Sequence, residues 1–328
     1  MKQSSVTRGT ALALAAAVLL GTGASAFFQK QQTVEEPEEG APLVRDLEIT
    51  TYREIPCESR FQASDSEGDD LTFSILREPK KGSVVIDGVN FTYTPDQGKT
   101  GGDSFTYTAA DSAGHVSQPA TVTVTIDKIR SGVTYADTGA CKAAAAAQRL
   151  AEEGVFTGVR IGEQYYFEPE RQVSRGEFLA MVLEACGRET TEVTITGFCD
   201  DEAIPAWAKS YAAAGVADGI VRGKATADGA AFRAEDPVTF NEAATVLDRV
   251  LDLNDVDLDV WYGDRTAVPS WAAQAVGNME AVQVLAAGSF GSADMCRQVS
   301  RADAANMLCA VMTLLEREDS GGGNGLFS

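Results

Sequence analysis

The amino-acid sequence predicts a two-domain protein, in which an all-β sandwich is followed by an all-α bundle of three repeats. From about Pro42 to Asp127, short runs of β-forming residues alternate with turn residues, which is typical of a sandwich. From Val133 onward the chain is rich in alanine and in amphipathic helical runs. In this second region a short motif recurs three times, at spacings of 65 and 61 residues. These spacings suit a small multi-helix module.

The first 26 residues have the features of a secretory signal peptide. Lys2 and Arg8 supply the cations, an apolar run follows, and Ala-Ser-Ala ends the segment as a small-residue cleavage site. The apolar run is short for a bilayer span, although an uncleaved anchor is an alternative. Residues 27–41 are rich in Gln, Glu and Pro and predict a flexible acidic spacer, and residues 319–328 predict a disordered, Gly-rich tail.

The charge of the chain restricts its partners. The 328 residues include 27 Lys and Arg against 48 Asp and Glu, a net charge of −21. Loss of the signal peptide would remove two cations and leave −23. This balance argues against nucleic acid as a ligand and against long-range attraction to an anionic polymer. An anionic ligand must therefore be captured locally, by a few placed cations.

The sandwich, residues 42–128, is predicted to contain six or seven short strands. The predicted strands are Leu47–Tyr52, Leu71–Leu76, Ser83–Ile86, Asn90–Thr94, Ser104–Ala109 and Thr121–Ile126, with another near Arg60–Ala63. Two aromatic pairs alternate along the fourth and fifth of these and are assigned to the core, namely Phe91, Tyr93, Phe105 and Tyr107. The amino-acid sequence of residues 90–95 and 102–111 resembles that of the Ig-like or cadherin-like modules of bacterial surface proteins.

One acidic region of the sandwich is a candidate calcium site. The carboxylates concerned are Asp65, Glu67, Asp69, Asp70 and Asp111. They could supply the oxygen ligands that calcium requires, although their spacing is not that of an EF-hand loop. The alternative is a set of solvated turns. No other cofactor is expected.

Six helices are predicted in the second domain, two in each repeat. They are Ala143–Glu153, Ser174–Ala185, Ala206–Ala217, Glu242–Leu251, Trp271–Val282 and Ser300–Leu315. The repeated motif starts the second helix of each pair and has the form of a capping box. Its capping residues are Ser174 with Glu177, Thr239 with Glu242, and Ser300 with Asp303. A valine precedes each cap and is placed for a hydrophobic staple, at Val173, Val238 and Val299.

Further landmarks occur in register with the motif. An aromatic-x-Asp triplet stands upstream each time, ending in Asp137, Asp200 and Asp264, and a Pro-x-Trp-Ala sequence follows the second and third triplets. This ordered set, over roughly residues 133–316, resembles the S-layer homology (SLH) repeats that hold bacterial surface proteins on the cell wall. The implied repeats are residues 133–196, 197–260 and 261–318. The resemblance implies a pseudo-threefold bundle whose grooves hold a pyruvylated amino-sugar of a secondary cell wall polymer.

Arginine is the motif residue that capping does not explain, because a cation beside the positive end of a helix dipole is unfavourable. The resemblance implies that Arg175 and Arg301 bind the wall polymer. The alternative is an ion pair with a neighbouring repeat, through Asp137, Asp200 or Asp264. The second copy has Phe240 in place of the arginine, so we expect a groove that depends on this cation to be weak or empty.

Four more residues match the implied wall-polymer site, although each also has a structural explanation. Trp207 and Trp271 match the family tryptophan, but packing in the interior is favoured because tryptophan is highly buried on average. Asp200 and Asp264 are expected to cap the loop or helix that follows them. The glycines Gly219 and Gly223 are assigned to turn geometry.

The cysteines leave two alternatives open. Cys186 and Cys199 flank one loop and could form a disulfide, or all six cysteines could be free thiols that pack as small apolar residues. With one histidine in the chain and no CxxC pair, a zinc site is not expected.

Taken together, the sequence predicts a secreted surface protein rather than an enzyme. The lone His115 lies in a turn, and the two domains leave no segment for a catalytic domain. The prediction is a protein attached non-covalently to the cell wall polysaccharide through its repeats, with no membrane contact after signal cleavage and with self-association in a surface layer. The alternative is an adhesin or carbohydrate-binding protein whose sandwich binds the ligand and whose repeats are a tether.

Overall fold

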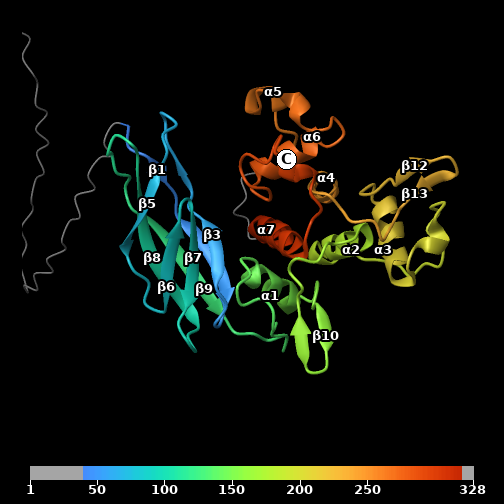
Figure 1. The fold of residues 1–328 in the computed structure, drawn as a ribbon, viewed down its shortest axis with the longest axis horizontal. Coiled ribbons are helices and arrows are strands. Elements are labelled where there is room, and N and C mark those ends of the chain that lie inside the picture. The colour runs from blue at the N-terminus through green and yellow to red at the C-terminus, as the bar shows by residue number, and fades with distance from the viewer. Residues whose placement is uncertain (1–39, 320–328) are drawn as a thin grey trace, which may run out of the picture. The chain divides into compact units, whose positions relative to one another are not determined.

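A computed structural model describes residues 40–319 of the chain (Figure 1). The predicted signal peptide and most of the predicted spacer and tail lie outside these residues. Within residues 40–319, no helix is both long and apolar enough to cross a membrane.

The N-terminal region of the described chain is β-rich. Its strands are β1 (Leu43–Val44), β2 (Leu47–Tyr52), β3 (Cys57–Arg60), β4 (Ala63–Ser64), β5 (Thr72–Arg77), β6 (Gly82–Asp87), β7 (Asn90–Pro95), β8 (Gly101–Ala110) and β9 (Ala120–Asp127). One sheet has the order β2-β9-β8-β5, with β2 parallel to β9, and the other has the order β3-β7-β6. The region is consistent with an Ig-like sandwich. The strand predicted near Arg60–Ala63 is two shorter ones, β3 and β4, on either side of Phe61.

Aromatic side chains from both sheets fill the space between them. Phe91 and Tyr93 of β7 and Phe105 and Tyr107 of β8 are all fully buried, as predicted. The Phe91 and Phe105 rings meet edge to face at 5.4 Å. The Phe61 ring packs on this group in a tilted arrangement, with its centroid 4.6 Å from that of Phe91 and 4.5 Å from that of Tyr107. The Tyr107 hydroxyl donates hydrogen bonds to the carbonyls of Arg45 and Gln62, which satisfies its polar end inside the sandwich.

The rest of the described chain is helical. Its helices are α1 (Ala144–Glu152), α2 (Arg175–Ala185), α3 (Ala206–Ala217), α4 (Phe240–Leu251), α5 (Leu258–Trp261), α6 (Ala273–Ala281) and α7 (Arg301–Asp319). Six of the seven match the predicted helices, while α5 was not expected. Two hairpins were also missed, β10 (Val159–Ile161) with β11 (Gln164–Tyr166) and β12 (Lys224–Thr226) with β13 (Gly229–Ala231). Strands of three residues are too short to show a period in the sequence.

The helices pair across the boundaries of the sequence repeats. Helix α2 packs on α3, α4 packs on α6, and α7, at the end of the chain, packs on α1, at the beginning of the helical region. One continuous apolar core runs through all three pairs. Each repeat therefore buries its second helix against the first helix of another repeat, and a single repeat would leave an apolar face uncovered.

A short 3₁₀ turn (Asp201–Ala203) leads into α3 and is tied to it by a charged hydrogen bond. Lys209 Nζ lies 2.6 Å from Asp201 Oδ2, and Thr196 donates to Oδ1 through both its amide and its hydroxyl, at 2.7 Å each. The bond from Lys209, together with those from Thr196, lowers the pKa of Asp201 to about 2.

This carboxylate makes folding depend on pH. Because the pKa of Asp201 is lower in the folded chain than in the unfolded one, its contribution is present above about pH 4 and is lost as the pH falls toward 2. We expect Asp201→Asn to unfold at lower urea concentration than the wild type at pH 6, with the difference disappearing near pH 2. Urea titrations at several pH values measure this, and a difference that stays constant down to pH 2 would contradict it.

Candidate functional site

The three motif segments start their helices in the same way. Ser174 accepts a hydrogen bond from the Glu177 amide and the Glu177 carboxylate accepts one from the Ser174 amide, at 3.2 and 3.0 Å. Thr239 and Glu242 form the same reciprocal pair at α4. Ser300 and Asp303 form it at α7 as well. All three predicted capping boxes are thus present.

The valines before these caps bind one another through their backbones. The Val173 amide donates to the Val299 carbonyl at 2.9 Å, the Val299 amide to the Val238 carbonyl at 2.8 Å, and the Val238 amide to the Val173 carbonyl at 3.0 Å. The cycle closes on itself, and all three side chains are buried. Every motif helix therefore begins next to the other two. The sequence showed three equivalent valines but gave no sign that they meet.

Arg301, the first residue of α7, is buried at the junction with the first motif segment. Its guanidinium donates to the Phe167 carbonyl at 3.0 Å and to Glu168 at 2.8 Å, and Glu177 lies 3.9 Å away. Only 3% of the residue is exposed. The guanidinium also lies over the Phe156 ring, 4.9 Å from its centroid. Burial, with the nearby Arg171, lowers the pKa of Arg301, so its charge is held at a cost in desolvation.

Arg175 occupies the equivalent place at the start of α2 and is more accessible. Its Nε donates to the Phe232 carbonyl at 3.1 Å, and its Nη1 lies 3.2 Å from Glu242 of the next motif segment. Lys224, on strand β12, reaches the same Glu242 oxygen at 3.0 Å. Although burial opposes ionisation, the bonds from Lys224 and the Thr239 amide and the charge of Arg175 hold the pKa of Glu242 below its ordinary value.

Arg175 and Arg301 do form ion pairs, but not with the predicted aspartates. The carboxylates that face Arg175 and Arg301 are glutamates, not the aspartates of the aromatic-x-Asp triplets. Asp137 instead accepts hydrogen bonds from the amides of Phe167 and Glu168, at 2.9 and 2.7 Å.

Asp200 repeats this arrangement in the second repeat. It accepts from the amides of Phe232 and Arg233, at 2.8 Å each, which lie more than 30 positions along the chain. Glu168 and Arg233 both have a positive φ, 55° and 56°. The aspartates thus hold the strained turn that presents a phenylalanine carbonyl to each arginine. Asp200 does not cap the turn that follows it, whereas Asp264 does, by accepting from the Thr266 amide.

At the third junction the cation comes from the opposite side. Phe240 has no charge, but Arg297 of the third motif segment lies over its ring, 4.9 Å from the centroid, and pairs with Asp303 at 3.0 Å. This junction therefore does contain a cation, and the weaker binding expected there stays a prediction. Comparing the three motifs position by position could not reveal this cation, because it comes from a different segment of the chain.

Both motif tryptophans are exposed, contrary to the expected interior position. Trp207 is 49% exposed and Trp271 is 58% exposed. They stand in the first turn of α3 and just before α6, where the chain enters the helix from a proline. The interior positions of α3 belong to Ala208, Ala212 and Gly215 instead. Gly219 and Gly223 have φ of 73° and 74°, as their turn assignment requires.

The acidic turns of the sandwich use their carboxylates locally. The five predicted calcium ligands were Asp65, Glu67, Asp69, Asp70 and Asp111. Asp65 accepts from two amides of its own turn, and Asp111 accepts from Gly114 and His115. Within the residues that the structure describes, no three Asp, Glu, His or Cys side chains form a group that could hold a metal ion. The structure therefore does not bring the predicted ligands together.

The six cysteines are free thiols in the structure, so Cys186 and Cys199 are not paired. Cys186 is half-buried, and burial raises the pKa of its thiol to about 11, which makes it a poor nucleophile.

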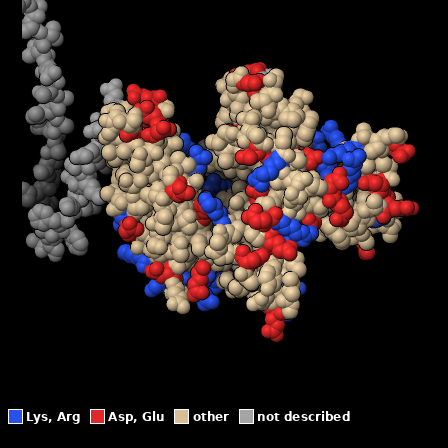
Figure 2. All heavy atoms as spheres, in the orientation of Figure 1, with Lys and Arg blue, Asp and Glu red and all other residues tan. Residues whose placement is uncertain are grey.

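Over the face shown in Figure 2, acidic and basic side chains alternate across the helical region. This face of the helical region therefore shows no broad basic surface.

A family model described as the bacterial cadherin-like domain matches residues 39–128. This agrees with the sandwich and with the resemblance found in its sequence. Among solved structures, the chain is similar to a fibronectin(III)-like module of CbhA from Clostridium thermocellum, with 14% identity and a TM-score of 0.18 over 27% of this chain and 100% of that one. It is also similar to the SrpA adhesin of Streptococcus sanguinis, with 18% identity and a TM-score of 0.22 over 37% and 82% of the two chains.

The chain is also similar to a curated protein. The "Surface-layer 125 kDa protein" of Lysinibacillus sphaericus is 30% identical over 101 residues, which are 31% of this chain and 8% of that protein. The chain thus matches only a small fraction of its relative. The cadherin-like domain and this weak homology together indicate a bacterial cell-surface protein with an Ig-like N-terminal domain.

Proposed function

We propose that the helical region holds the protein on the bacterial cell wall by binding an acidic carbohydrate polymer, and that the cadherin-like domain is displayed outward. The ligand class is a sugar that carries a carboxylate, such as a pyruvylated amino-sugar of a secondary cell wall polymer. Support comes from the similarity to a surface-layer protein and from the arginines at the junctions between motif segments. The repeats would then be SLH repeats.

The junction of Arg175 is the best candidate for the primary site, because its charges do not cancel. Arg175 and Lys224 both contact a single carboxylate, that of Glu242. A ligand carboxylate could therefore replace Glu242 on Arg175 while Glu242 kept Lys224 as its partner. The exchange would leave no carboxylate unpaired. This local excess of cations, in a chain of net charge −21, is the observation that carries the proposal.

The junction of Arg301 is a secondary site. There Arg301 and Arg171 face Glu168 and Glu177, so the charges balance. Arg301 is 3% exposed, while Glu168, which covers it, is 42% exposed at its side chain. A ligand would have to displace Glu168 before it reached the guanidinium. Glu168 would retain Arg171 nearby, at 3.6 Å.

The test is sedimentation of the full chain with purified cell walls. We expect Arg175→Ala combined with Lys224→Ala to weaken wall binding at least about tenfold, since the ligand loses its guanidinium partner and the nearby carboxylate of Glu242 is left unpaired. Arg160→Ala with Lys99→Ala removes the same charge from a hairpin and a sandwich loop and is the matched control. Circular dichroism checks that both double variants are folded.

Chemical removal of the wall polymer should abolish binding of the wild type. Undiminished binding to stripped walls, or wild-type affinity of the folded Arg175→Ala, Lys224→Ala variant, would refute the proposed function.

A further inference from the structure

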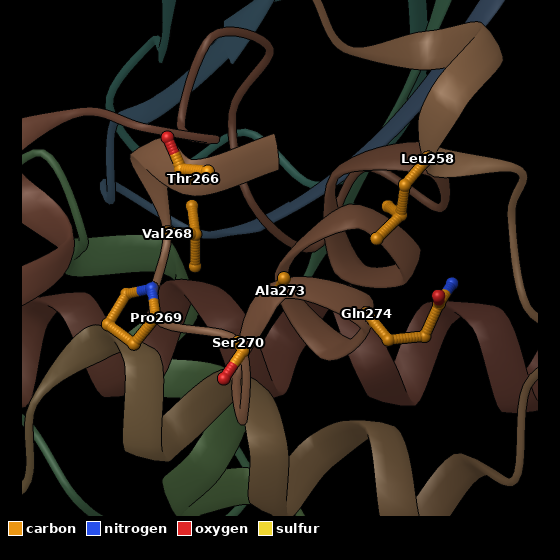
Figure 3. A pocket seen from close by; sticks show the side chains of 7 residues that line it. All are labelled: Leu258, Thr266, Val268, Pro269, Ser270, Ala273 and Gln274. Carbon is orange, nitrogen blue, oxygen red and sulfur yellow. The ribbon is translucent and has the colours of Figure 1, made fainter. Parts of the chain in front are cut away.

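A hollow of the described bundle lies at the start of the third repeat, under the unexpected helix α5 (Figure 3). Its cavity volume is about 510 Å³. Leu258 of α5 forms one side, and the segment from Thr266 to Gln274 forms the other, through Val268, Pro269, Ser270 and Ala273. The three arginine junctions contribute no residue to it.

This hollow depends on features that are special to the third repeat. Helix α5 precedes the third aromatic-x-Asp triplet, while the stretch before the second triplet contains no helix. Gly277 of α6 permits the close approach of α5, because a Cβ there would lie 2.6 Å from the Leu258 side chain. Tyr262 follows α5 and stacks on Phe290 at 3.8 Å between ring centroids, which fixes the chain after the helix.

Two tryptophans adjoin the lining residues along the chain. Trp261 is 55% exposed and ends α5, one turn after Leu258. Trp271 is 58% exposed and directly follows Ser270. Both exposed indoles thus belong to the two chain segments that line the hollow, and they offer flat apolar faces that the core does not use.

The polar lining selects the kind of ligand. Ser270, Thr266 and Gln274 contribute hydroxyl and amide groups, and none of the seven lining residues is charged. Thr266 donates its hydroxyl to Asp264, and Gln274 donates its amide to Val256 and Asn278, so both can still accept hydrogen bonds from a ligand. A purely apolar partner would bury these acceptors unpaired.

Charge excludes the other large classes of ligand. Asp257 and Asp259 flank the start of α5, and Asp264 lies beside Thr266. These carboxylates disfavour polyanions, including nucleic acid, acidic glycans and anionic membranes. A neutral sugar chain meets every condition, since its rings present CH faces to the indoles and hydroxyl donors to the free acceptors.

We propose that the hollow under α5 is a binding site for a neutral glycan, in which Trp261 and Trp271 stack on pyranose rings and Ser270, Thr266 and Gln274 hydrogen-bond to their hydroxyls. The site is independent of the arginine junctions and takes an uncharged part of a carbohydrate. Neutral units of a wall polymer and the glycan backbone of the wall share this chemistry.

The experiment uses tryptophan fluorescence of the full chain. Trp207→Phe leaves Trp261 and Trp271 as the two indoles of the chain, so quenching by acrylamide reports on these two side chains. The probes are neutral hexasaccharides of glucose, mannose, galactose or N-acetylglucosamine, with a galacturonic acid hexamer as the anionic comparison. We expect at least one neutral probe to protect the indoles, and the anionic one to give no protection.

Variants assign the binding to the hollow. By calorimetry, Trp261→Ala with Trp271→Ala should weaken binding of the protecting probe at least about tenfold, as loss of aromatic anchors does. Trp207→Ala, at the matching place in the second repeat where α5 has no counterpart, should change it less than twofold. Gly277→Ala should weaken it without removing any group that contacts the sugar.

The outcome separates this site from the proposed function. The Arg175→Ala, Lys224→Ala variant should bind the neutral probe like the wild type. Intact and polymer-stripped walls, compared in that variant, tell a polymer source from a backbone source. Failure of every neutral probe to protect the indoles, protection by the galacturonic acid hexamer alone, or wild-type affinity of the double tryptophan variant would each overturn the proposal.

Discussion

Replacing Arg301 by alanine is expected to lower the free energy of unfolding of the helical region by about 3 kcal/mol, because a buried charged donor is lost. The Phe167 carbonyl would lose its hydrogen bond in a place that water reaches poorly, and Phe156 would lose the guanidinium stacked over it. The junction between the last helix and the first motif segment would be left with a cavity. Urea unfolding followed by circular dichroism at 222 nm measures the effect.

Arg175→Ala is the matched control, since it removes the same residue from the equivalent position. Its side chain is 13% exposed, against 3% for Arg301, and Lys224 remains to pair with Glu242. We expect a loss of only about 1 kcal/mol. Equal losses in the two variants would contradict the assignment of Arg175 to the primary ligand site and of Arg301 mainly to the packing of its junction. A destabilisation by Arg175→Ala as large as that predicted for Arg301→Ala would favour a purely structural role for both.

In the sandwich, Phe91→Ala is expected to cost about 4 kcal/mol, the range for removal of a fully buried phenylalanine. Phe91 is 0% exposed and contacts the Phe61 ring, between β3 and β4, and the Phe105 ring of the facing sheet. The vacated space cannot be filled by small movements, because its neighbours are themselves large rings. Hydrogen exchange with mass spectrometry should show loss of protection in β7 and β8.

Phe91→Leu keeps most of the volume and should cost about 1.5 kcal/mol or less. Val85, on the neighbouring strand β6, is 65% exposed, so Val85→Ala should change protection little. If Phe91→Ala left exchange in β7 and β8 unchanged, the aromatic cluster would not be the core on which the sandwich depends.

Much of the local structure could be predicted from the sequence. Capping boxes depend on residues three positions apart, so Ser174 and Glu177 were sufficient to place the start of α2. Alternation along a strand depends on residues two apart, so the burial of Phe91 and Tyr93 followed from the pattern. The assignment of Gly219 and Gly223 to turns was also correct, since both have a positive φ.

Contacts between distant segments could not be predicted in the same way. The arginines are unexplained by capping, but their glutamate partners lie in other segments of the chain. The substitution by Phe240 shows that the second motif has no cation at that position. It does not show that Arg297 supplies a cation to the same junction, because Arg297 is 57 positions away in the chain. Tryptophan is highly buried on average, which led to the prediction that Trp207 and Trp271 lie in the interior. Both are exposed, because each stands at the start of a helix on the side that faces solvent.

The sequence by itself determined most of the sandwich strands, the six long helices, where the motif helices begin, and that one motif recurs three times. These properties depend on neighbours within one turn or one strand. The tertiary structure decided that the three valines close a ring of hydrogen bonds, which arginine is buried, and where α5 leaves a hollow. Each of these depends on how far apart the segments lie in space, and that distance is set by the packing of the whole core.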